Sequence, residues 1–198
     1  MVKKNLNTDY IEKIFLESSQ LVKNSSYLSA DIIECVNIII KSLKQGKKIV
    51  IFGNGGSAAD AQHIAAEFVG RFNLERKSIP SIALTTDTSI ITSIGNDYSF
   101  NLIFSRQCES IVSKGDIVIG ISTSGNSLNV LNGLKISKKN GAKTIGLLGN
   151  NGGKIKSIVD NPIIIKSKST ARIQEVHRIV SHLICDLVEK QWREMNHD

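Results

Sequence analysis

Short apolar runs alternate with helical patterns through most of this chain. The runs cover residues 49–52, 81–84, 116–121, 144–148 and 162–165. Between them, apolar residues recur at helical spacing, so the pattern predicts strands that alternate with helices. Strands that are apolar throughout are typical of a parallel sheet covered on both faces. We therefore expect an α/β fold, a flavodoxin-like, doubly wound sheet of five parallel strands.

Helical patterns also precede and follow the predicted sheet. Residues 8–43 carry apolar positions at helical spacing and predict one or two amphipathic helices, which Gly46 ends. A long C-terminal helix is predicted for residues 171–194. No linker or low-complexity segment divides the 198 residues, and a chain of this length can bury one core. We expect a single domain over residues 1–198, with an N-terminal helical extension (1–46) and an α/β sandwich (47–198).

Composition excludes several classes of protein. The net charge of +7 suggests nucleic-acid binding, but the basic residues are spread along the chain and aromatic residues make up only 5%. Nucleic acid is therefore an unlikely partner.

Cys35, Cys108 and Cys185 lie singly and far apart, so we expect buried, reduced thiols. The N-terminus lacks a signal-peptide pattern, and no apolar run could span a bilayer. These features predict a cytoplasmic protein without a membrane partner.

A glycine-rich turn, residues 53–57, directly follows the first predicted strand and opens a helix. Its sequence is Gly-Asn-Gly-Gly-Ser, and backbone N–H groups at such a turn can converge on an anion. The helix that begins there carries His63 and Glu67 four residues apart, on one face. A single segment thus supplies an anion cradle and an ionisable pair. It predicts a site that binds a phosphorylated small molecule and does chemistry on it.

A second turn, residues 122–127, follows the third predicted strand and is rich in hydroxyl groups. Ser122, Thr123, Ser124 and Ser127 place four hydroxyls within six residues. An ordinary helix cap would need only one of them. Ligands of such sheets bind beyond the carboxyl ends of the strands. We therefore expect a phosphate group at this turn, whereas residues 149–153 have ordinary loop composition and predict only a turn.

Segments 53–71, 95–97, 120–127 and 171–182 together resemble the motifs of the sugar isomerase (SIS) domain family, in the same order along the chain. Within that family, the chain is most similar to the phosphoheptose isomerases, over essentially all of its length. This resemblance implies an aldose–ketose isomerase that converts sedoheptulose 7-phosphate to D-glycero-D-manno-heptose 7-phosphate through an enediolate. The product would feed a heptose-containing surface polysaccharide. The resemblance also implies a homotetramer with active sites at subunit boundaries.

The same resemblance implies roles for individual residues. Substrate contacts are implied for Asn54, Gly55, Gly56, Ser57, Glu67, Asn96, Asp97, Ser122, Thr123, Ser124, Ser127 and Gln174. Glu67 and His182 are implied as the catalytic pair. In members that carry the metal, a zinc ion is implied on His63, Glu67, Gln174 and His182. The chemistry suits these groups, since a desolvated carboxylate can take a proton from carbon and a histidine can move one between oxygens. Zinc would polarise the same oxygens.

Helical geometry adds one expectation about the shape of the site. Gln174 and His182 are eight residues apart, about 80° around the helix, so the site must run along the helix axis. His177 lies off that face and is expected to be structural.

The chain departs from the family pattern at one place. Some phosphoheptose isomerases carry an aspartate just before Arg172, whereas residues 167–171 here contain no carboxylate. Another residue would have to replace it, or the substrate or rate would differ.

Two alternative functions share the fold. One is a non-catalytic SIS tetramer that binds the bacterial replication initiator protein, a group that also shows sequence similar to residues 169–175. The presence of both Glu67 and His182 favours the enzyme. The other is a sugar-phosphate-sensing regulator with an attached DNA-binding domain, for which about 45 N-terminal residues are too few and too amphipathic. The apolar face of that extension instead predicts burial against another subunit, so we do not expect a monomer.

Overall fold

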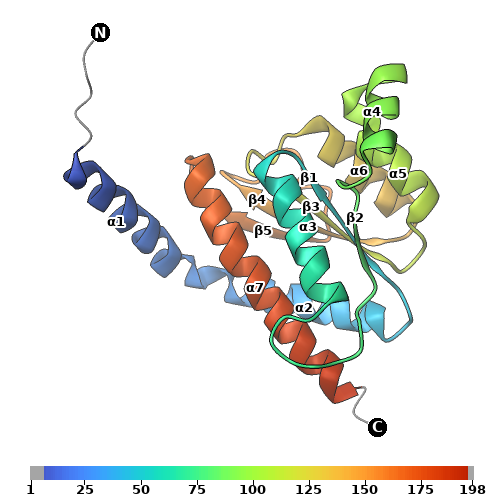
Figure 1. Cartoon of the computed structure of the whole chain (residues 1–198), viewed down its shortest axis with the longest axis horizontal. Helices are drawn as coiled ribbons and strands as arrows, with labels where there is room; N and C mark the ends of the chain where they lie inside the picture. The colour runs from blue at the N-terminus through green and yellow to red at the C-terminus, as the bar shows by residue number, and fades with distance from the viewer. Residues whose placement is uncertain (1–6, 196–198) are drawn as a thin grey trace.

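Five parallel strands form one sheet at the centre of the computed structural model, which describes residues 7–195 (Figure 1). The strands are β1 (Ile49–Gly53), β2 (Ser81–Ala83), β3 (Ile117–Ser122), β4 (Lys143–Gly149) and β5 (Asn161–Ile165). Their order across the sheet is β2-β1-β3-β4-β5, and every neighbouring pair is parallel. The strand order reverses between β1 and β3, as in flavodoxin-like folds. The fold class expected from the sequence is confirmed.

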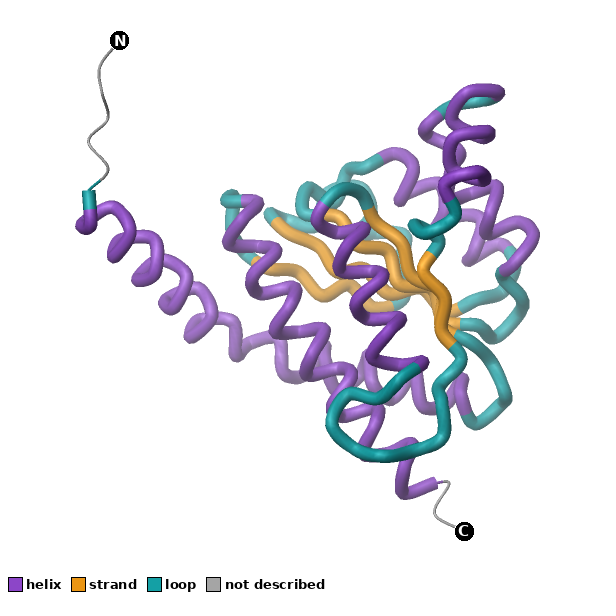
Figure 2. Tube along the Cα trace, in the orientation of Figure 1, coloured by secondary structure: helices purple, strands orange, loops and turns teal. Residues whose placement is uncertain are grey.

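Helices cover both faces of this sheet (Figure 2). One face packs against α2 (Ser29–Leu43), α3 (Gly56–Val69) and α7 (Thr170–Met195), and the other against α5 (Ile103–Ile111) and α6 (Leu128–Lys139). Successive side chains of each strand point to opposite faces of the sheet, so the hydrophobic core consists of two clusters, one on each face. Ile49 and Ile51 of β1 belong to the first cluster, and Val50 and Phe52 belong to the second. Strands that are buried on both faces explain the continuous apolar runs in the sequence.

The segment before β1 is helical, as predicted. It consists of α1 (Thr8–Asn24), the short 3-10 helix η1 (Ser25–Leu28) and α2. None of the residues in α1 is buried, and the helix projects away from the sheet (Figure 1). Two contacts tie it to α7: the Ser18 hydroxyl donates to Glu175 Oε2 at 2.5 Å, and Arg172 Nη1 donates to the Ile14 carbonyl at 3.3 Å. After β2, α4 (Thr88–Asp97) and η2 (Phe100–Leu102) lead into α5.

The three cysteines are buried and unpaired, as expected from their spacing. Burial raises the pKa of each thiol, so the thiols of Cys35, Cys108 and Cys185 stay protonated near neutral pH. From residue 7 to residue 195, no helix combines the length and apolar character needed to cross a bilayer.

Candidate active site

The glycine turn (53–57) joins β1 to α3 at the carboxyl end of the sheet. Gly55 has a φ of +55°, a backbone conformation that glycine adopts readily. Gly56 is equally constrained, because a Cβ there would lie 2.5 Å from Nε2 of Gln174 on α7. Asn54 exchanges two side-chain amide hydrogen bonds with Asn129 of α6, at 2.8 and 2.9 Å. The turn is thus packed between α6 and α7, and its backbone approaches Gln174 closely.

The hydroxyl loop (122–127) lies beside the glycine turn because β1 and β3 are neighbours, with Gly53 paired to Ile121. Ser122 Oγ lies 3.0 Å from Ser127 Oγ and 3.4 Å from Ser124 Oγ. Ser127 occupies the N-cap position of α6, yet its side chain makes no capping hydrogen bond. Its hydroxyl is therefore turned toward the other serines, an arrangement that suits phosphate oxygens. Thr123 is half-buried beside them.

Two ionisable groups of α3 meet His182 of α7. Nε2 of His63 lies 3.0 Å from Nε2 of His182 and 3.3 Å from Oε1 of Glu67. All three side chains are half-buried. The two helices also meet at a second point, where Gln174 of α7 lies against Gly56 of α3. Gly56 precedes His63 by seven residues, and Gln174 precedes His182 by eight. The two helices therefore run in the same direction, side by side (Figure 1). Seven residues span about 10 Å of helix, which separates the glycine turn from the histidine pair.

The donor types in this cluster suit zinc, which takes imidazole nitrogen and carboxylate oxygen. The pair of nitrogens at 3.0 Å is close to the separation of about 3.3 Å expected for two ligands of a tetrahedral zinc site. Burial lowers the pKa of His63, and the positive charge of the nearby Arg178 lowers it further. A lower pKa favours the neutral form, which can bind a metal. Within residues 7–195, however, no three His, Cys, Asp or Glu side chains form a ready-made metal site. The ligand chemistry fits zinc, but the metal site is not preformed.

An ion pair that was not predicted from the sequence joins the same two helices. Arg178 Nη2 lies 2.5 Å from Oδ1 of Asp60, a carboxylate that is only 6% exposed. Burial raises the pKa of Asp60, and Arg178 opposes the shift. Both residues line a hollow of about 590 Å³ together with Gly56 and Gln174. Helical spacing could have indicated Arg178 as a residue of the site, since it stands four residues from both Gln174 and His182 and so shares their face of the helix.

Two of the predicted substrate contacts lie apart from this cluster. Asn96 and Asp97 are exposed at the end of α4, where the amide of Asn96 donates to Asp97 Oδ1 at 2.8 Å. α4 stands away from the α3–α7 pair in Figure 1. His177, expected to be structural, is fully buried and contacts the Leu148 carbonyl at 3.1 Å. The structure thus places Gln174 with the glycine turn and the hydroxyl loop at the carboxyl end of the sheet. It brings His63, Glu67 and His182 together about 10 Å further along α3 and α7.

Comparison with known proteins identifies the family of this chain. The model of the SIS domain family matches residues 9–149. A phosphoheptose isomerase of Nitratiruptor sp. is 51% identical over 185 residues, which are 93% of this chain and 99% of the relative. One of Clostridium acetobutylicum is 48% identical over 95% of both chains. The structure of a phosphoheptose isomerase from Neisseria gonorrhoeae matches with a TM-score of 0.88 and 38% identity, over 92% of this chain and 98% of that one.

Fold, site and similarity together define the class of protein: the chain belongs to the SIS domain family. Within this family it groups with the phosphoheptose isomerases, and it is therefore a sugar-phosphate isomerase.

Proposed function

We propose that this chain interconverts sedoheptulose 7-phosphate and D-glycero-D-manno-heptose 7-phosphate. The observation that carries the proposal is the contact between His182 of α7 and the His63–Glu67 pair of α3. These groups are about 115 residues apart in the sequence, yet they meet on the same pair of helices that leads from the glycine turn, about 10 Å away. The similarity to phosphoheptose isomerases supports the choice of substrate.

The distance along the helices suits a long substrate. The phosphate would be held by the hydroxyl loop and the backbone N–H groups of the glycine turn. The sugar chain would extend along α3 and α7 toward the histidine pair, about 10 Å away. Binding energy at the phosphate would then align the reacting carbons, which lie at the far end of the substrate.

Proton transfer at those carbons is assigned to two residues. Glu67 would take the proton from carbon and return it to the neighbouring carbon. His182 would move a proton between the two substrate oxygens, since an imidazole can both accept and donate a proton. Nε2 of His63 lies within reach of both groups, and its single N–H would orient whichever of them accepts it.

Zinc binding is part of the proposal. His63, Glu67, Gln174 and His182 would hold the ion, although glutamine is an unusual zinc ligand. When bound, the metal would supply Lewis-acid polarisation of the carbonyl and hydroxyl groups of the substrate.

A homotetramer is also part of the proposal, as the resemblance to the family implies. Asn96 and Asp97 are exposed and lie apart from the histidine pair. Their implied role in substrate binding then favours a site that a second subunit completes. We place the enzyme in the cytoplasm, where it would supply heptose for a surface polysaccharide.

The decisive experiment is turnover of sedoheptulose 7-phosphate by the purified protein, with and without added zinc. Glu67→Gln removes the proposed base without changing its shape, and we expect turnover to fall by about 10²- to 10⁴-fold. The matched control is Glu109→Gln, which alters an exposed glutamate on α5. It should leave turnover unchanged.

Failure of the folded wild-type protein to turn over this substrate in either condition would refute the proposal. It would then favour the non-catalytic alternative, a binding protein for the replication initiator. A response to zinc would show whether the metal takes part in the reaction.

A further inference from the structure

A buried carboxylate on α7 lies outside the groups assigned to the reaction. Glu189 is 1% exposed, and both of its oxygens accept hydrogen bonds from the loop between α3 and β2. Oε1 accepts from the backbone N–H of Phe72 at 2.8 Å. Oε2 accepts from those of Asn73 and Leu74, at 2.7 and 2.8 Å. Three consecutive N–H groups of this loop therefore depend on one side chain.

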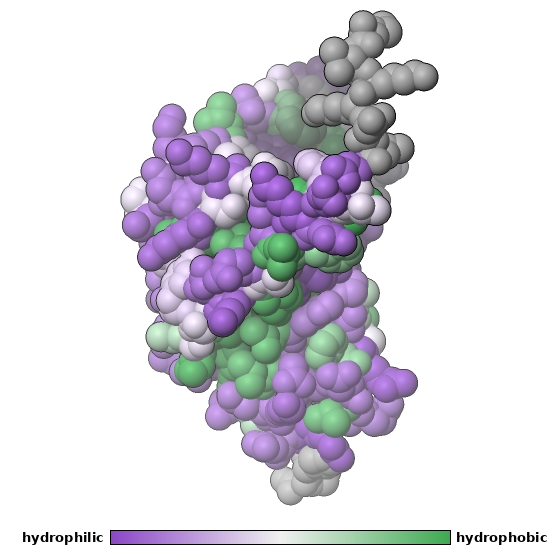
Figure 3. Space-filling view, turned by 90° about the vertical axis from the view of Figure 1, so that its left-hand side faces the viewer, coloured by the Kyte–Doolittle hydropathy of each residue, from purple (hydrophilic) through white to green (hydrophobic). Residues whose placement is uncertain are grey.

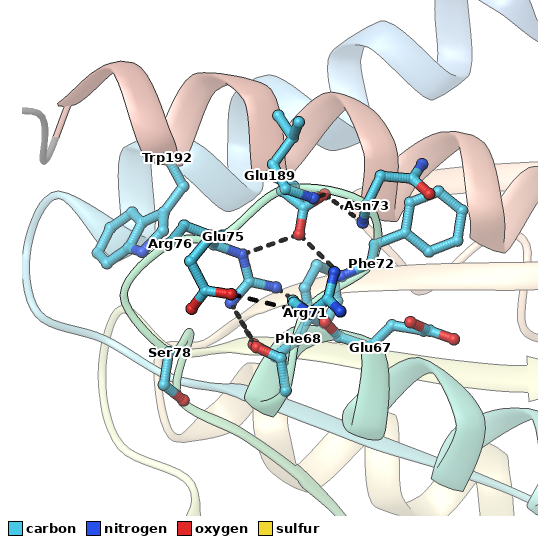
Figure 4. A network of polar contacts seen from close by, with 12 residues as sticks. Glu67, Phe68, Arg71, Phe72, Asn73, Glu75, Arg76, Ser78, Glu189 and Trp192 are labelled. Atoms are coloured by element: carbon cyan, nitrogen blue, oxygen red, sulfur yellow. Dashed lines mark hydrogen bonds and ion pairs between the residues drawn. The ribbon is translucent and has the colours of Figure 1, made fainter.

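An equally buried cation completes this arrangement, which we call the Glu189 network: Glu189, Arg76 and the backbone of residues 72–74 (Figure 4). Nε of Arg76 lies 3.2 Å from Glu189 Oε1, and both side chains are 1% exposed. Burial would raise the pKa of Glu189, but the three N–H groups and Arg76 outweigh burial and lower it. Glu189 is therefore anionic near neutral pH.

The network reaches His182 through Phe72. The Phe72 ring lies 5.5 Å from the His182 ring, centroid to centroid, with an angle of 37° between the planes. The backbone N–H of the same Phe72 is fixed by Glu189. Glu189 stands seven residues after His182 on α7, two helical turns along one face. The loop thus returns to α7 and places an aromatic ring against the proposed proton-transfer group.

The network reaches Glu67 through Arg76. Nη2 of Arg76 donates to the backbone carbonyl of Glu67 at 2.8 Å, and Nη1 donates to that of Phe68 at 2.9 Å. These carbonyls belong to the last turn of α3, whose C=O groups have no partners within the helix. Arg76 therefore caps the end of α3 that carries Glu67. In Figure 2 the loop can be followed from the end of α3 around to β2.

We propose that Glu189 and Arg76 are positioning residues for the isomerase reaction. Together they hold Glu67 and His182, which come from different helices, in one fixed relation. The inference rests on the proposed function of these two residues. A buried ion pair contributes little net stability compared with apolar side chains of similar size. Its use here is orientation: one carboxylate and one guanidinium fix a loop, a helix end and an aromatic ring together.

Two variants separate positioning from stability. Glu189→Gln is isosteric, but both oxygens of Glu189 accept two hydrogen bonds each, so the amide nitrogen must face N–H donors and break contacts. Phe72→Leu leaves the loop backbone anchored, keeps an apolar side chain against the core and removes the aromatic contact with His182. Lys190→Gln is the matched control, because it removes an exposed ion pair with Asp186 on the same helix.

Two spectroscopic signals report on the loop and on the site. Trp192 is the single tryptophan of the chain, and its indole N–H donates to the Lys77 carbonyl of this loop at 3.0 Å. Its fluorescence therefore reports loop displacement. The chain contains four histidines, so the NMR signal of the His182 imidazole can be assigned. That signal senses the neighbouring Phe72 ring, whether or not the protein is active.

We expect Glu189→Gln to lower kcat by about 10- to 100-fold with little change in KM, because displaced groups lose alignment rather than substrate affinity. Trp192 emission should shift to longer wavelength below the unfolding temperature. Phe72→Leu should lower kcat less, move the His182 signal and leave Trp192 emission unchanged. Lys190→Gln should match the wild type in every measurement.

Wild-type kcat in a folded Glu189→Gln protein with a shifted Trp192 signal would overturn the inference. So would a wild-type kcat in folded Phe72→Leu, which decides the matter if Glu189→Gln does not fold. Inactive wild-type protein would instead refute the proposed function. The His182 signal in Glu189→Gln, which keeps the Phe72 ring, would then still decide whether the network positions this side chain.

Discussion

His177 shows how burial changes the chemistry of one residue on the helix of the site. Its side chain is fully buried, and Nε2 must donate to the Leu148 carbonyl because a carbonyl can only accept. Nδ1 is left without a hydrogen-bond partner among the described residues. Burial lowers the pKa of His177 from 6.5 to about 4, although the bond to Leu148 opposes the shift. The folded protein therefore keeps His177 neutral.

This shift predicts a loss of stability in mild acid. Between pH 6.5 and about 4, the unfolded chain binds a proton at His177 and the folded protein does not. The free energy of unfolding therefore falls as the pH falls through this range, by up to about 3 kcal/mol from this residue. Urea denaturation at pH 7.5 and at pH 4.5 measures the change. His177→Gln, which keeps a donor for Leu148, should lose less stability than the wild type. An equal loss in both proteins would contradict the assignment.

At the scale of an element, the hydroxyl loop depends on a glycine that packs against another turn. Gly125 has a φ of +66°, and a Cβ there would lie 2.2 Å from the Gly152 carbonyl oxygen. The N–H of Ile155 also donates to the Gly125 carbonyl at 3.0 Å. The turn 149–153, for which the sequence predicted only ordinary loop structure, thus supports the loop that holds the serines.

Gly125→Ala should therefore displace the hydroxyl loop. The backbone conformation alone costs about 1–2 kcal/mol for a residue with a side chain, and the clash with the turn adds to it. We expect a lower free energy of unfolding and a KM for the sugar phosphate raised by about tenfold, if each lost phosphate contact costs about 1.4 kcal/mol. Gly46→Ala is the control, because Gly46 has a φ of +68° and a Cβ there would meet nothing within 4 Å. It should cost stability without raising KM.

The strands could be predicted from the sequence because their apolar runs have one cause, burial on both faces of a parallel sheet. The predicted runs at 49–52 and 162–165 differ from β1 and β5 by one residue at a single end. The two turns proposed to bind the substrate could be found because strand ends carry a local composition signal. The residues that give this signal are neighbours in the sequence, so it can be recognised without knowledge of the tertiary structure.

The connections between segments could not be predicted in this way. Arg76 and Glu189 are 113 residues apart, and nothing near either residue marks the other as its partner. Asp60 and Arg178 are likewise joined only because α3 and α7 pack side by side. Such pairs depend on tertiary packing. Helical spacing places Arg178 on the face of Gln174 and His182, but it does not identify the partner on the other helix. The family resemblance named the groups proposed to do the chemistry, and the structure adds the contacts proposed to position them.

At the scale of the whole molecule, α1 presents an apolar face that no other part of residues 7–195 covers. Ile11 and Phe15, about 40° apart around the helix, are 53% and 72% exposed. Figure 3 shows hydrophobic side chains gathered on the side of the molecule where the N-terminal helices lie, bordered by hydrophilic ones. Ile179 and Leu183 of α7 are also exposed, at 39% and 45%. An apolar surface of this kind is typical of a subunit interface.

Phe15→Glu tests whether this face joins subunits. Phe15 is 72% exposed in the single chain, so a charge there should leave the fold intact, as circular dichroism would show. In an assembly the same charge would be buried without a partner, which disfavours association. We expect light scattering after size-exclusion chromatography to give a smaller mass than for the wild type. Isomerase activity should fall with it, since the proposed site needs a second subunit.

Gln20→Glu places the same charge on the same helix, about 140° around from Phe15, and should keep the wild-type mass. A wild-type mass for Phe15→Glu would show that α1 is not the interface. A smaller mass with full activity would contradict the proposal that a second subunit completes the site. It would mean that each chain carries a complete site, and that Asn96 and Asp97 bind substrate within their own subunit or do not bind it at all.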